Sequence, residues 1–223
     1  MGMGGRMATL TDAKILILTQ WLSPAFPVGA FAYSHGLEAA VDMGWVRDSG
    51  GLEAWLTDVL ECGAGRSDAL FLAASYHAAE AEALADIDAT ARAFASSAER
   101  LLETHAQGAA FGKVANAVWD MKLDTLLYPV ALGVAARREG VPLALTSKMY
   151  LQAFASNLIA AAQRLLPVGQ TEGQAILRRL TGLCSDIAEV TQDGDMERLG
   201  STAFLSDIAA MRHETQTSRI FRT

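Results

Sequence analysis

The stretch Met149–Leu166, MYLQAFASNLIAAAQRLL, decides the fold of this 223-residue chain. In a helix it would be apolar on most of its faces, and such a helix is stable only where other elements surround it. Its uncharged part, from Met149 to Gln163, is too short to span a bilayer and includes glutamine, serine and asparagine. We therefore expect a central helix enclosed by other helices, without a membrane span.

Helical periodicity continues on both sides of this stretch. Apolar residues recur at three- and four-residue intervals in Ile15–Leu22, Leu52–Leu60 and Ile176–Val190. No convincing pair of strands and no internal repeat is visible in the sequence. The pattern predicts an all-α fold, a single compact bundle of roughly eight to ten helices. This bundle would occupy residues 9–223, and residues 1–8 would be a flexible N-terminus or an expression remnant.

Capping and breaking residues predict where individual helices begin and end. Asp48 is placed to cap one helix, and Ser96 with Glu99 has the spacing of a capping box before another. That second helix would run to about Trp119. Pro167 would end the central helix, because proline lacks the N–H that continues the hydrogen-bond pattern.

Composition and charge exclude several classes of function. The net charge of −7 argues against a general nucleic-acid binder. Two cysteines are too few for a disulfide framework or a CxxC zinc site, and the four histidines have no His or Cys partner at helical spacing. The segment GAAFGKV, 108–114, lacks the spacing and the Ser or Thr of a phosphate-binding loop. We expect a cytoplasmic protein with no secretory signal, no metal site of its own and no enzymatic activity.

The stretch SPAFPVGAFAYSHGLEAA, residues 23–40, is not explained by an ordinary helical core. Pro24 and Pro27 would end the first helix and stiffen a loop, and Gly29 can adopt a positive φ that other residues resist. Gly36 would lie within a helix, where glycine costs about 1 kcal/mol relative to alanine. That cost indicates a close approach of another backbone, either inside the fold or from a partner.

Two later places also resist an explanation by core packing alone. Arg164 leaves the central helix just before its proline stop, where it either complements the helix dipole or faces an acidic or phosphate-bearing partner. The segment 216–223 is a C-terminal tail that carries large apolar groups beside arginines, the residue types that dominate interface energetics. Through Arg219, Ile220, Phe221 and Arg222 it would dock either within the chain or onto a partner.

At these places the chain resembles the UreF family of accessory proteins for nickel-urease maturation. The resemblance rests on the text SPAFPVGAFAYSHGLEAAVDMGWV, LYPVALGVAARREGVP, RLLPVGQTEGQ and MRHETQTSRIFR, in this order from about Ile15 to Thr223. The tail departs from the family pattern at Thr217, where a tyrosine is expected, and more mildly at Ile220 and Thr223. The segment STAFLSD lacks the proline expected before its aspartate.

The resemblance implies an all-α protein without catalytic chemistry that forms a homodimer. Its partners would be UreD (UreH in some organisms), the GTPase UreG and apo-urease, and the assembled complex would handle nickel without a cofactor bound to this chain. Carried over residue by residue, Glu38 and Arg164 would face the GTPase. The tail residues Arg219–Arg222 would engage UreD.

Two other functions remain open. The chain could regulate GTP hydrolysis by UreG if Arg219 or Arg222 reached the partner's active site, since an arginine finger is worth about 10³–10⁵ in rate. It could also be an independent helical enzyme with a buried pocket. That function has the least support, because no helix face of the sequence groups Asp, Glu, His or Cys.

Overall fold

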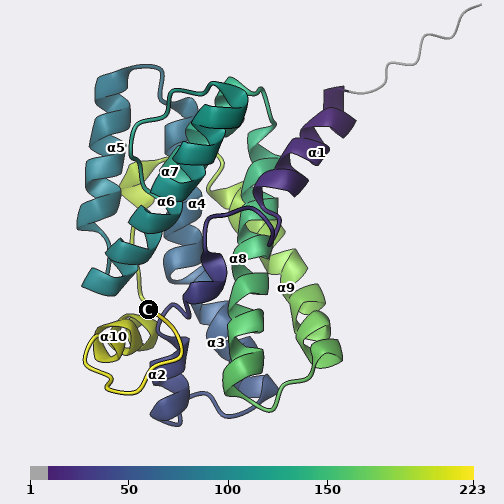
Figure 1. Ribbon diagram of the computed structural model, residues 1–223, viewed down its shortest axis with the longest axis vertical. Coiled ribbons are helices and arrows are strands. Elements are labelled where there is room, and N and C mark those ends of the chain that lie inside the picture. Colours follow the sequence, from purple (N-terminus) through teal and green to yellow (C-terminus); the bar gives the residue numbers. More distant parts are fainter. Residues whose placement is uncertain (1–9) are drawn as a thin grey trace, which may run out of the picture.

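The computed structural model describes residues 10–223, and all regular structure among them is helical (Figure 1). The all-α prediction is confirmed, and the ten α-helices of the described residues fall within the expected number. The expectation for residues 1–8 lies outside the described part of the chain. In chain order the elements are α1 (Leu10–Trp21), η1 (Ala30–Ala32), α2 (Leu37–Asp42), α3 (Ser49–Glu61), α4 (Ala64–His77), α5 (Ala81–Ala93), α6 (Ala98–Trp119), α7 (Tyr128–Arg138), α8 (Leu143–Leu165), α9 (Gln170–Val190), η2 (Met196–Arg198) and α10 (Phe204–His213).

Helix α8 lies at the centre of the bundle, as its sequence predicts. It contacts α2, α3, α4, α7 and α9, and Leu151, Ala155 and Ala162 have no exposed surface (Figure 1). One side is less covered, because Gln152 is exposed and Asn157 is only half-buried. Asn157 lines a cavity together with the loop between α1 and α2. None of the helices in residues 10–223 combines the length and the apolar character that a membrane crossing requires.

Most predicted helix boundaries agree with the structure, and one is shifted. Asp48 caps α3 by accepting the N–H of Gly51 at 2.8 Å. The cap of α6, however, is Ser97 rather than Ser96, and its hydroxyl accepts the N–H of Arg100 at 3.0 Å. The expected capping box is wrong because the Glu99 carboxylate faces the C-terminal part of the chain instead of turning back toward the start of its own helix.

The C-terminal part of the chain packs against α2. Helix α10 crosses α2 and the start of α6, and the tail that follows returns to the loop before α2 (yellow in Figure 1). Gly36 was expected inside a helix but lies just before α2 in the left-handed conformation, with φ of 76°. A Cβ at this position would come within 2.7 Å of the backbone nitrogen of Ala210. The close approach expected at Gly36 therefore lies inside the fold, between α2 and α10.

Candidate partner-binding site

The tail, residues 216–223, lies against η1 and α2. The backbone N–H groups of Ile220 and Phe221 donate to the two oxygens of the Glu38 carboxylate at 2.7 and 2.9 Å. The N–H of Arg222 donates to the carbonyl of Ala32 at 2.8 Å. One carboxylate thus binds two consecutive amides, which fixes the direction of the tail. Of the two expected ways for the tail to dock, the described structure shows the one within the chain.

The polar trio Ser34-His35-Gly36 forms the socket for the last residue of the tail. The main-chain oxygen of Thr223 accepts two hydrogen bonds from Ser34, one from its N–H at 2.7 Å and one from its hydroxyl at 2.6 Å. His35 and Gly36 both have positive φ, 57° and 76°. This left-handed pair turns the chain sharply between η1 and α2, and Ser34 lies at the entrance to that turn. The Thr223 hydroxyl also donates to Glu103 at 3.2 Å.

Glu38 is buried, with 5% of its surface exposed. We expected it on a surface that faces a GTPase, and the structure corrects that position, because both of its oxygens are used within the chain. Burial by itself would raise the pKa of the Glu38 carboxyl. The amides of Ile220 and Phe221 and the ring of His213 lower it by more than that, so the pKa lies below its ordinary value. A contribution of Glu38 to partner recruitment stays a prediction, and it would act through the tail.

His213, the last residue of α10, connects the tail to two helices. It has no exposed surface, and its Nδ1 lies 2.6 Å from Glu99 Oε2 while its Nε2 lies 3.2 Å from Glu38 Oε2. The Arg219 guanidinium donates to the other oxygen of Glu99 at 2.6 Å. Sequence reasoning missed Glu99 and His213 as site residues. The two residues are 114 positions apart, no local pattern relates them, and only the fold brings them together.

Arg164 and Phe221 were assigned to two different partner surfaces, and the structure brings them into contact. The guanidinium carbon of Arg164 lies 4.4 Å from the centroid of the Phe221 ring, a cation–π geometry. Phe221 is 4% exposed, whereas Ile220 is 56% exposed and Arg222 is also exposed. The tail therefore has an inner side that anchors it and an outer side that faces solvent.

A buried ionic network lies beneath the tail. Arg100 donates to Asp68 at 2.6 Å and lies 3.4 Å from Glu103, and the Tyr150 hydroxyl donates to Asp68 at 2.6 Å. Burial raises the pKa of the Glu103 carboxyl, but Arg100 and the other neighbours lower it below its ordinary value. Among residues 10–223 no group of three or more His, Cys, Asp and Glu side chains is arranged to hold a metal ion.

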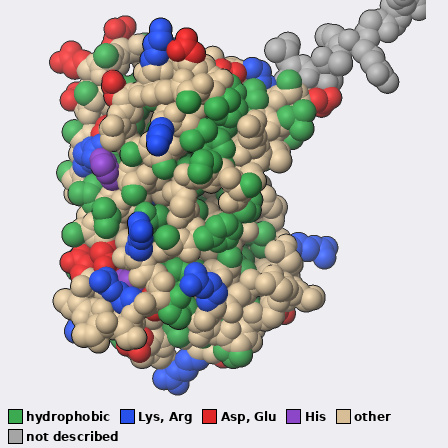
Figure 2. Space-filling model, in the orientation of Figure 1, with side chains coloured by type: hydrophobic (Ala, Val, Ile, Leu, Met, Phe, Trp, Pro, Cys, Tyr) green, Lys and Arg blue, Asp and Glu red, His purple; other side chains and the backbone are tan. Residues whose placement is uncertain are grey.

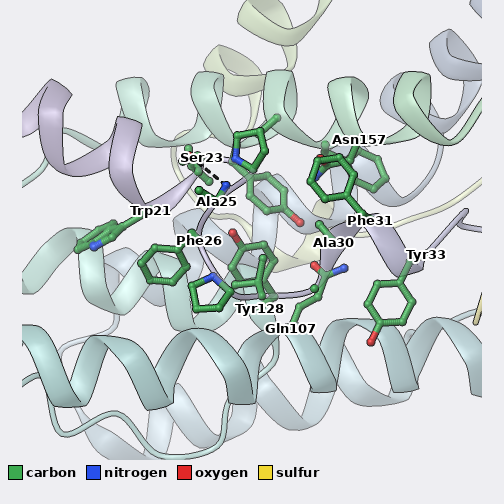
Figure 3. Close-up of a pocket in the computed structure, with 18 of the residues that line it drawn as sticks. Trp21, Ser23, Ala25, Phe26, Ala30, Phe31, Tyr33, Gln107, Tyr128 and Asn157 are labelled. Atoms are coloured by element: carbon green, nitrogen blue, oxygen red, sulfur yellow. Dashed lines mark hydrogen bonds between the residues drawn. The ribbon is translucent and has the colours of Figure 1, made fainter. Parts of the chain in front are cut away.

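The loop from Ser23 to Tyr33 borders a cavity of about 220 Å³ beside this network (Figure 3). Gly29 has a positive φ of 75°, as expected, and begins η1. Pro24 and Pro27 lie on the loop and line the cavity. Loop, α6, α7 and α8 together supply its aromatic and amide groups, which include Phe26, Phe31, Gln107, Tyr128, Phe154 and Asn157.

The lining of this cavity is poor in charge, because Glu103 is the one charged residue among the described residues that form it. Figure 2 shows hydrophobic side chains gathered over the centre of the face on which α8 and the loop lie. Phe31 is 48% exposed at the edge of the cavity. Aromatic and apolar groups of this kind bind partner side chains by excluding water. The guanidinium groups of Arg164 and of the tail arginines can add directional hydrogen bonds. The described site thus offers binding chemistry on two adjoining surfaces, the tail and the loop.

Comparison with known proteins agrees with the resemblance seen in the sequence. The UreF family model matches residues 46–181. The chain is 54% identical over 217 residues to the urease accessory protein UreF of Ruegeria pomeroyi, with 97% of this chain and 100% of the relative covered. It is 54% identical over 218 residues to the protein of that name from Roseobacter denitrificans, with coverages of 98% and 97%. The chain belongs to the UreF family of urease accessory proteins.

Proposed function

We propose that this chain is a non-enzymatic scaffold in urease maturation. Together with UreD (or UreH) it would recruit the GTPase UreG and support nickel insertion into apo-urease, in the cytoplasm and as a homodimer. Nickel is the cargo of the assembled complex in this proposal, and the chain itself carries no cofactor. The name shared by its relatives, urease accessory protein, supports a role in making active urease.

The observation that carries the proposal is the two-sided tail. Glu38 holds the backbone of Ile220 and Phe221, so the outward side chains of Ile220 and Arg222 are already in place before a partner binds. Ordering such side chains in advance removes part of the entropy cost of association. An apolar group beside a guanidinium is a common pair of interface anchors. We assign this outer side of the tail to UreD.

Arg164 connects the tail to the proposed GTPase-facing surface. It is exposed at the end of α8 while its guanidinium covers Phe221, so a partner that binds Arg164 also contacts the tail. Glu38 supports the same surface from beneath. The hydrophobic face around Phe31 is the surface we assign to the second copy of the chain in the homodimer.

Co-purification with UreD and UreG tests these assignments. We expect Ile220→Asp and Arg222→Glu to abolish UreD binding and Arg164→Glu to abolish UreG recruitment, with helical content unchanged. Arg178→Glu, an exposed arginine on α9, is the matched control and should keep both partners. Binding of UreD by both tail variants would refute the tail assignment, and recruitment of UreG by Arg164→Glu would refute the assignment of Arg164.

A second function, regulation of GTP hydrolysis by UreG, is favoured by one observation. Arg219 is bound to Glu99, whereas the exposed guanidinium of Arg222 has no hydrogen bond or ion pair to the described residues. Arg222 is therefore the residue that could enter a partner's active site, where an arginine finger is worth about 10³–10⁵ in rate. Stimulated GTP turnover that disappears with Arg222→Ala would establish this function, and unchanged turnover would exclude it.

A further inference from the structure

The contacts of His213 require more protons than its neutral form carries. A neutral imidazole donates from one ring nitrogen and accepts at the other, whereas an ionised carboxylate only accepts. Both ring nitrogens of His213 face carboxylate oxygens, of Glu99 at 2.6 Å and of Glu38 at 3.2 Å. Both contacts are therefore hydrogen bonds only when the cluster Glu38–His213–Glu99 holds one additional proton.

The charges around this cluster lead to the same requirement. From the tail, Arg219 neutralises one carboxylate by its bond to Glu99. The other partners of Glu38 are neutral backbone amides. On α10 itself Arg212 is exposed, and the carboxylate of Glu214 accepts the N–H of Ala98 at the start of α6. On α6, Arg100 pairs with Glu103, which His35 also faces at 3.5 Å. Among the described residues Glu38 therefore has no cationic partner other than His213, and a buried charge without such a partner is costly.

His213 is the member of the cluster whose two ring nitrogens both face a carboxylate oxygen. The amides of Ile220 and Phe221 and the His213 ring keep the pKa of the buried Glu38 carboxyl below its ordinary value, so Glu38 is ionised when the tail is docked. Glu99 accepts hydrogen bonds at both oxygens, from Arg219 and from His213, as an ionised carboxylate does. A protonated His213 satisfies both carboxylates at once and balances the charge of the cluster.

We propose that docking of α10 and the tail takes up one proton into the Glu38–His213–Glu99 cluster, which makes this C-terminal unit a pH-sensitive latch with His213 as its positioning residue. When α10 leaves α2 and α6, His213 becomes solvated and no longer faces two carboxylates. Docking must therefore weaken as the pH rises and the proton is lost. Within the proposed function, on which this consequence rests, the latch controls the presentation of the outer tail to a partner.

Release of α10 from α2 and α6 would also affect a second surface. The exposed face of α10 carries four large apolar side chains, Phe204, Leu205, Ile208 and Met211. Because His213 ends this helix and its ring contacts the same Glu38 carboxylate that binds the tail, α10 and the tail share this attachment to α2. Gly36 sets how closely that attachment can form, since α10 rests on its backbone. The latch would thus position the apolar face and the tail together.

Hydrogen exchange of the full-length chain between pH 6 and pH 9 tests the latch. The amides to follow are Ala210 in α10 and Phe221 in the tail, each divided by its rate in an unstructured peptide of the same sequence at the same pH. With one proton taken up on docking, protection falls by up to tenfold per pH unit. Constant protection of both amides in the wild-type chain would overturn the proposal.

Two variants separate the proton from a merely structural role of the histidine. In His213→Gln, protection should be lower at pH 6 and independent of pH. If His213→Gln unfolds α10, Glu99→Gln replaces it in the test. A glutamine amide can donate to a neutral ring nitrogen, so docking of this variant no longer needs the extra proton and protection should not depend on pH. His77→Gln, at the end of α4, is the matched control and should keep the wild-type slope. A slope that persists in both cluster variants would refute the proposal.

The same samples distinguish failure of the latch from failure of the proposed function. UreD binding is measured over the same pH range with the wild-type chain and with a chain that ends at Thr215. If protection depends on pH but both chains bind UreD equally, the latch stands and the tail is not the UreD site. If only the full chain binds UreD and protection is constant, the tail site stands and the latch is refuted.

Discussion

At the scale of single residues, Glu38 makes several of the contacts that hold the C-terminal part of the chain. Its carboxylate accepts the amides of Ile220 and Phe221 and also contacts the ring of His213, so one side chain of α2 binds both the tail and α10. Removing its charge leaves buried amides without a matching acceptor. The consequence should therefore appear at the tail first and in the global stability second.

We predict that Glu38→Gln lowers the free energy of unfolding by about 1.5–3 kcal/mol, the range for hydrogen bonds to a charged group. A glutamine offers one oxygen, and its NH₂ group would face an N–H of the tail. Urea unfolding and exchange of the Ile220 and Phe221 amides measure the effect. Glu53→Gln is the control, since Glu53 forms an exposed pair with Arg179 and should change little. Tail amides as protected as in the wild type would contradict this role.

Acid should weaken the same region. The folded pKa values of Glu38 and Glu103 lie below the ordinary value of 4.5, so both carboxylates stabilise the folded state above that pH. Their contribution is lost as the pH falls below 4.5 and through the folded pKa values. Unfolding free energies measured from pH 5 to pH 3 should therefore decrease, and Glu38→Gln should reduce the dependence. An equal dependence in the variant would exclude Glu38 as a source.

The sequence identified the tail and its docking partners only separately. Glu38 was selected through the family resemblance, whereas Arg164 and the tail residues Arg219–Arg222 already stood out as residues that core packing does not explain. Nothing in the sequence joined Glu38 to the tail. Glu38 and Ile220 are 182 residues apart, and no local pattern relates positions at that distance. Burial of Glu38 was missed for the same reason, because a glutamate in the first turn of a short helix normally faces solvent.

At the scale of elements, the packing of α10 on α2 depends on the left-handed turn before α2. Gly29 and Gly36 have nearly the same φ, 75° and 76°. A Cβ at Gly29 meets no atom within 4 Å, whereas one at Gly36 meets the backbone of Ala210 at 2.7 Å. The two glycines thus separate the cost of backbone conformation from the cost of contact.

We predict that Gly29→Ala costs about 1–2 kcal/mol, from the left-handed backbone alone. Gly36→Ala should cost about 1–3 kcal/mol more, because α10 must move away from α2. Thermal or urea unfolding of both variants gives the difference, and exchange at Ala210 shows whether α10 is the part that moves. Equal costs at the two positions would mean that the contact between α2 and α10 carries little of the stability.

Most elements could be read from the sequence because apolar periodicity and helix-breaking residues act locally. The central helix α8 and the cap at Asp48 are examples. Predictions failed where a distant contact decided the outcome. Gly36 lies before α2 instead of within it, in a left-handed conformation that brings its backbone close to α10. The N-cap of α6 is Ser97, and Glu99 binds His213 and Arg219 instead of completing a capping box.

At the scale of the whole molecule, two surfaces adjoin. The loop from Ser23 to Tyr33 borders the cavity on one side and leads into the socket for Thr223 on the other. The unusual composition of that loop is explained by this double use. In the proposed function this loop would lie between the surface assigned to the second copy and the tail assigned to UreD.

The most direct test of the scaffold is the amount of nickel per urease active site in cells whose urease gene cluster lacks its own UreF. The account predicts that the full chain restores nickel loading and that a chain ending at Thr215 leaves urease empty, although α1–α10 remain folded. Using the chain's cognate cluster removes differences in partner surfaces as an explanation. Empty urease with the full chain folded and expressed, or equal loading by the truncated chain, would contradict the account.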